Sequence, residues 1–144
     1  MSATEMLSSN FLGLDIERGV MDLKKGTITC FMIVEHIHDI DFIRKQVLSL
    51  IVAGCRNFTF YGQQESIWHL ETDLADIKVH PNSNEVALTS TSKSLNDFID
   101  EIKLEINLRP IVPNYNYLIY DDEKIYREIL RQLKISSFFV PLNC

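Results

Sequence analysis

Long apolar runs are missing from this sequence. No segment approaches the roughly 20 consecutive apolar residues that a transmembrane helix requires, so we expect no membrane association. The first ten residues contain no basic residue and no apolar stretch of the signal-peptide type. From these features we expect a soluble protein that stays in the cytoplasm.

Glycine and clustered basic residues are also scarce. The chain has 5 glycines, and neither the dinucleotide-binding fingerprint nor the P-loop is present. It carries 14 Lys and Arg against 20 Asp and Glu, for a net charge of −6. Because proteins that bind phosphate backbones need a basic patch, we expect no nucleic-acid partner. A basic protein partner suits the acidity better, although mild acidity also serves solubility.

Paired cysteines and nucleophile motifs are absent as well. Cys30, Cys55 and Cys144 form no CxxC pair and no zinc-finger spacing, which fits a reducing compartment. Cys30 lies in an apolar run and is predicted to be a buried thiol. There is no GxSxG elbow. We therefore expect no cofactor, and the sequence favours a protein that is not an enzyme.

Four apolar, β-rich segments alternate with four segments of helical periodicity. The predicted strands are 27–34, 57–61, 85–90 and 115–120, and the predicted helices are 39–53, 64–76, 94–107 and 123–134. This alternation predicts right-handed crossovers and a parallel sheet. The predicted fold is α/β: one domain over residues 1–144, with a mainly parallel sheet of four or five strands in three αβα layers. Residues 1–26 are predicted to form an N-terminal arm or an edge element.

Two segments predict where the core lies. The first strand reads TITCFMIV, an almost continuous apolar run that is typical of a strand buried on both faces. In the helix 64–76, apolar residues recur at helical spacing. Its candidate core positions are Ile67, Trp68, Leu70, Leu74 and Ile77. The apolar tail 138–142 is expected to pack on the domain or on a partner.

Polar groups gather where the predicted strands end, and ligands of open parallel sheets usually bind there. Glu35, His36 and His38 follow the first strand, and Asp121 and Asp122 follow the last. Such groups could bind a metal or serve a small enzyme. An HxH spacing is common in loops, however, and acids at a helix start are favoured by the helix dipole. We therefore predict no metal site and keep a strand-end ligand site as an alternative.

The third predicted helix is strongly acidic. Asp97, Glu101 and Glu105 fall at i, i+4 and i+8 on one face, with Asp100 beside them and Lys103 as the one offsetting charge. Like charges at this spacing repel one another by a few tenths of a kcal/mol per pair, which a fold tolerates easily. Such a face is either simply solvated or suited to docking a basic surface.

In size, acidity, cysteine usage and lack of a catalytic motif, the chain resembles the small acidic immunity proteins that bacteria make against their own toxins. Barstar-like inhibitors illustrate the principle, with an acidic helix and loop that plug a basic nuclease site. The segment YLIYDDEKIYREIL is similar to uncharacterised small bacterial α/β families, which supply no function. The resemblance implies a cytoplasmic protein that neutralises a basic cognate toxin by covering its active or binding surface.

The residues expected to bind this partner are acids of the third helix and the last strand end, with aromatic anchors. They are Asp97, Asp100, Glu101, Glu105, Asp121, Asp122, Tyr61 and Tyr120. Two alternatives remain open. One is a small enzyme or a ligand- or metal-binding domain that uses the strand ends. The other is an oligomeric adaptor without chemistry of its own.

Overall fold

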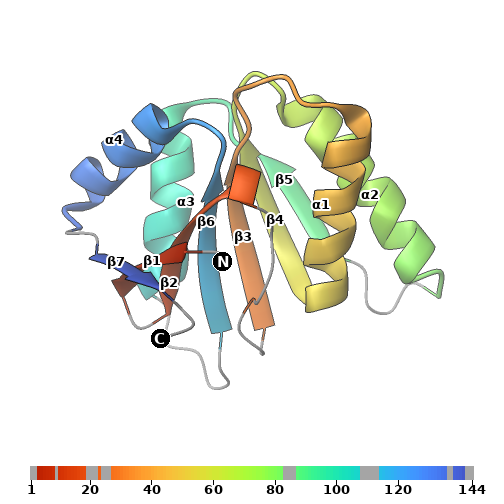
Figure 1. The fold of residues 1–144 in the computed structure, drawn as a ribbon, viewed down its shortest axis with the longest axis horizontal. Coiled ribbons are helices and arrows are strands. Elements are labelled where there is room, and N and C mark those ends of the chain that lie inside the picture. The colour runs from red at the N-terminus through yellow and green to blue at the C-terminus, as the bar shows by residue number, and fades with distance from the viewer. Residues whose placement is uncertain are drawn as a thin grey trace.

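One mixed sheet organises the chain (Figure 1). The computed structural model describes residues 3–8, 10–18, 23, 27–82, 87–107, 114–135 and 138–141. Its strands are β1 (Ala3–Ser8), β2 (Phe11–Asp15), β3 (Thr27–Ile33), β4 (Cys55–Tyr61), β5 (Leu88–Thr91), β6 (Asn114–Tyr120) and β7 (Phe138–Pro141). Its helices are α1 (Ile40–Ala53), α2 (Glu65–Val79), α3 (Leu95–Asn107) and α4 (Glu123–Leu133), with a 3-10 turn at Ile16–Arg18.

The strand order is β5-β4-β3-β6-β2-β1-β7. The run from β5 to β2 is parallel, whereas β1 is antiparallel to β2 and β7 is antiparallel to β1. The α/β class and the mostly parallel sheet are therefore confirmed. The expected four or five strands were too few, because β1, β2 and β7 extend the sheet on one side. Residues 85 and 86 of the third predicted strand lie outside the described residues.

The N-terminal segment contributes two strands of the sheet. Phe11, Leu12 and Leu14 of β2 are buried, and β2 pairs in parallel with β6 over its whole length. Phe11 packs with one helical layer and Leu12 with the other. β2 therefore lies within the sheet, between β6 and β1. Its short apolar run was a weak signal, because a strand of five residues gains its stability from neighbours distant in sequence.

Helices cover both faces of the sheet (Figure 1). α1 and α2 pack on one face, where they bury Cys30 and Met32 of β3. α3 and α4 pack on the other face, against Phe31 and Ile33 of the same strand. This alternation confirms that β3 is buried on both sides. Burial raises the pKa of the Cys30 thiol, whose sulfur lies 2.8 Å from that of Cys55.

Helix α2 is oriented differently from its predicted packing. Trp68 is fully buried and Ile67 is half-buried, but Leu70, Leu74 and Ile77 are 56%, 51% and 63% exposed. The prediction that these three form core is wrong.

The helix instead turns polar residues inward, and each has partners there. Glu71 binds Arg44 of α1, the Thr72 hydroxyl donates to the Trp68 carbonyl, and Asp76 accepts from the Ala87 amide.

Candidate functional site

The loops after β3 and β6 meet at the switch point of the sheet. From β3 the chain passes to β4 and β5 on one side, then returns through α3 to β6 on the other. In open parallel sheets, the crevice at such a point is the usual ligand site. Here both loops carry the polar groups that the sequence singled out.

Asp121 closes this crevice. Its side chain is fully buried. One carboxylate oxygen accepts the Glu35 amide at 2.8 Å, and the other accepts the His36 amide at 2.9 Å. The second oxygen also lies 3.0 Å from Nε2 of His38. A single carboxylate thus connects the end of β6 to the loop that follows β3.

Neighbouring side chains add further contacts between the same two loops. Asp122 lies 3.1 Å from Nε2 of His36 and accepts the Ile125 amide at 2.9 Å, which confirms an acidic cap on α4. The His38 ring stacks on Phe42 at 5.0 Å. The structure therefore brings together the five strand-end groups of the sequence prediction, and they bond to one another and to nearby backbone. Among the described residues, no group of three or more His, Cys, Asp or Glu side chains is placed to hold a metal ion.

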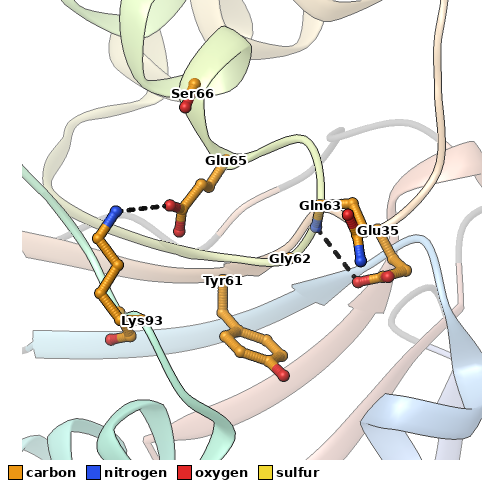
Figure 2. A pocket seen from close by; sticks show the side chains of 8 residues that line it. Glu35, Tyr61, Gly62, Gln63, Glu65, Ser66 and Lys93 are labelled. Carbon is orange, nitrogen blue, oxygen red and sulfur yellow. Dashed lines mark hydrogen bonds and ion pairs between the residues drawn. The ribbon is translucent and has the colours of Figure 1, made fainter.

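A polar hollow of about 360 Å³ lies beside these strand-end contacts, at the ends of β4 and β5 (Figure 2). Its lining residues are Glu35, Tyr61, Gly62, Gln63, Glu65, Ser66, Ser92 and Lys93. Figure 2 shows Tyr61 extending between the Glu65–Lys93 pair and Glu35. The Tyr61 ring also stacks on Phe98 of α3 at 5.4 Å. Burial and the Glu35 charge both raise the pKa of Tyr61, which therefore presents a neutral hydroxyl.

Gly62 allows the chain to turn sharply at this hollow. Its φ is +134°, a conformation that residues with a side chain rarely adopt, and a Cβ there would lie 2.5 Å from the Val34 carbonyl oxygen. The turn places the Gln63 amide 3.3 Å from a Glu35 carboxylate oxygen. The turn therefore fixes the Glu35 end of the hollow.

A second hollow, of about 390 Å³, adjoins the first and shares Ser92 and Lys93 with it. Its other lining residues are Thr91, Asp97, Asp100, Glu101 and Leu104. We call the linings of the two hollows together the acidic surface. It carries five carboxylates and one lysine, and Nζ of that Lys93 is already paired with Glu65 at 2.9 Å.

The acidic surface contains half of the predicted partner-binding residues. Asp97, Asp100, Glu101 and Tyr61 line it. Glu105 is half-buried and lies outside both linings. Asp121 and Asp122 instead make the strand-end contacts described above, with the loop after β3 and the start of α4.

Tyr120, the remaining predicted anchor, is only 8% exposed and stacks on Tyr126 at 4.0 Å. It is therefore a core residue. Burial, followed by the charges of Asp15, Glu5 and Glu123, raises the pKa of Tyr120 to about 12.

Glu65, Ser66 and Lys93 were not singled out as binding residues from the sequence. Lys93 follows β5, and Glu65 opens α2 directly after the β4 turn. Their positions at the ends of strands were the available signal. That signal could not place Glu65 and Ser66 beside the acids of α3, because the strand order was not known, whereas Lys93 lies only four residues before Asp97.

The fold and this surface define a class: an α/β protein with a mostly parallel sheet and an acidic surface at the carboxyl ends of its strands. Comparison with protein-family models, with curated proteins and with solved structures found no match to the chain. Within the described part of the chain, no helix is both long enough and apolar enough to span a membrane.

Proposed function

We propose that this chain is a non-enzymatic binding protein that engages a basic protein partner through its acidic surface. In the most concrete form of the proposal, it is a bacterial immunity protein that neutralises a cognate toxin by covering the active or binding surface of the toxin. The observation that supports this most is the pair of adjoining hollows, which hold five carboxylates around one lysine that is already paired.

The charges of the surface suit a cationic side chain from a partner. Asp97, Asp100 and Glu101 are exposed carboxylates on the first two turns of α3, and all three line the same hollow. Carboxylates held close together repel one another, and a partner's arginine or lysine would relieve that repulsion on binding. Opposite charges also speed the encounter between two proteins.

The surface also offers apolar contacts beside its charges. Leu104 is 64% exposed at the edge of the second hollow. The Tyr61 ring is half-buried and held against Phe98, so that little side-chain entropy would be lost when a partner covers it. An aromatic anchor next to carboxylates is a combination typical of residues that dominate binding energy at interfaces.

The strand-end groups are bonded to one another and to the backbone. An enzyme or ligand site at the switch point would draw on His36, His38, Asp121 and Asp122. These four side chains bond to one another in two close pairs, and Asp121 and Asp122 also accept backbone amides. We infer that they have a structural role, because they connect the loop after β3 to the end of β6 and the start of α4.

Neutralising the acids tests the proposal on the purified pair. We expect the variant D97N/D100N/E101Q to bind its basic partner about 100-fold more weakly, because each lost contact is worth about 1 kcal/mol. The matched control is E17Q/D39N/D41N, which removes three exposed charges outside the acidic surface. Isothermal titration measures both. Unchanged affinity in the first variant, or an equal loss in the control, would overturn the proposal.

A further inference from the structure

Exposed aliphatic side chains are concentrated on the outer face of α1 and α2. Among the described residues, nine large hydrophobic side chains are exposed, and five of them lie on these two helices. They are Leu48 and Val52 of α1 and Leu70, Leu74 and Ile77 of α2. A groove of about 320 Å³ runs between the helices, with Leu48 and Leu74 on opposite sides. Clustered apolar exposure of this kind marks interaction sites in proteins.

The outward side of α2 makes this face unusual. A helix that only covers a sheet turns its apolar side inward and its polar side to solvent. Beside Trp68, α2 buries Glu71, Thr72 and Asp76, and it leaves Leu70, Leu74 and Ile77 outside, at i, i+4 and i+7. That spacing forms the ridge that packs into the groove of another helix. The outward ridge is therefore suited to a contact that this chain alone does not make.

The charges of the face favour a second copy of this chain as the occupant. Its exposed charged residues are Asp41, Arg44, Lys45 and Lys78, the Asp73 side chain is about half exposed, and Arg44 is paired with buried Glu71 at 2.9 Å. The face has no excess of acid, whereas the whole chain carries a net charge of −6. Two copies of an acidic protein repel each other least when they meet through the region with no excess of negative charge.

The direction of the helices adds complementarity between two copies. α1 and α2 run the same way along the face (Figure 1), with Asp41 in the first turn of α1 and Lys78 in the last turn of α2. A two-fold axis across the helices would place the Asp41 end of one copy against the Lys78 end of the other. Each ion pair would then form twice, around a centre of leucine and isoleucine.

We propose that two copies of this chain associate through the outer face of α1 and α2, in an antiparallel two-fold arrangement. The proposal does not depend on the proposed function. The acids of α3 lie on the opposite face of the sheet and stay open to a partner in this dimer.

Sedimentation equilibrium tests the dimer. We expect the full chain to dimerise with a Kd near or below about 10 μM, and Leu74→Glu to weaken association at least about tenfold. Leu104→Glu is the matched control, because Leu104 is a similarly exposed leucine on α3. Far-UV circular dichroism confirms that both variants are folded. A wild-type chain that stays monomeric up to about 100 μM, or an equal loss in the control, would overturn the proposal.

Exchanging two charges tests the orientation. Lys78→Asp alone is expected to weaken the dimer about tenfold, because it sets two carboxylates against each other at both ends of the interface. The double variant D41K/K78D restores opposite charges and is expected to recover most of the association. A double variant that dimerises no better than Lys78→Asp would contradict the antiparallel arrangement.

Discussion

Asp121 is the residue on which the strand-end geometry depends most. We expect Asp121→Ala to lower the free energy of unfolding by about 2–4 kcal/mol, because the Glu35 and His36 amides lose a charged acceptor whose side chain is fully buried. Asp122→Ala is the control. It removes one helix cap and should cost about 1 kcal/mol. Urea denaturation of both variants measures the difference. A change below about 0.5 kcal/mol for Asp121→Ala would show that its carboxylate does not hold the two loops.

Tyr120 gives the fold a specific sensitivity to alkali. Burial raises the pKa of Tyr120 from 10.0 to about 12, so between these values the unfolded chain releases a proton that the folded chain keeps. Stability is unaffected by this group below pH 10 and falls as the pH rises toward 12, by up to about 2–3 kcal/mol. Tyr126, whose pKa burial also raises, adds to the fall. Urea titrations near pH 9 and 11.5 should show a smaller loss in Tyr120→Phe than in the wild type. An equal loss in both proteins would contradict this assignment.

Individual residues differed in how well they could be predicted. Cys30 was expected to be a buried thiol and is, because its strand is apolar on both sides. An acidic cap before α4 was expected and is Asp122. The burial of Asp121 could not be predicted, because its three hydrogen-bond donors lie more than 80 residues away in the sequence. Only the strand order brings them together.

Among the elements, α4 and β1 are joined by an ion pair that spans most of the chain. Arg127 binds Glu5 through two nitrogens, at 2.9 and 2.7 Å, and the Glu5 side chain is only 9% exposed. We expect Arg127→Ala to lower the free energy of unfolding by about 1–3 kcal/mol, because it leaves a nearly buried carboxylate without this partner. Arg131→Ala on the same helix removes a pair with the more exposed Glu128 and should cost less than about 0.5 kcal/mol. If Arg127→Ala and Arg131→Ala lower the stability equally in thermal or urea denaturation, the Arg127–Glu5 ion pair does not have this role.

The positions of the helices and of the central strands could be predicted from the sequence. Which side of each helix points toward the core could not always be predicted. The alternation of periodicities located β3, β4, β6 and all four helices within a few residues. The inward face of α2 was misjudged because its apolar residues were taken as core. Arg44, the Trp68 carbonyl and the Ala87 amide instead make it favourable to bury Glu71, Thr72 and Asp76. Periodicity finds the apolar side of a helix but does not show what that side contacts.

At the scale of the whole molecule, the two faces of the sheet differ in surface chemistry. The α1–α2 side exposes aliphatic residues with few net charges, and the α3 side carries the carboxylates that line the second hollow. The overall acidity could be read from composition. The sequence could not predict that Glu35, Glu65 and the α3 acids lie on one surface, because this requires β5 to lie at the sheet edge beside β4.

The central claim is that the acidic surface binds a basic protein. The most direct test is affinity capture from the native host with tagged wild-type protein and, in parallel, with D97N/D100N/E101Q, followed by mass spectrometry. We predict that the wild type retains a basic protein in a one-to-one molar ratio and that the variant does not retain it. If the wild type retains no protein, or if both forms retain the same one equally, the acidic surface is not the binding site and the account is contradicted.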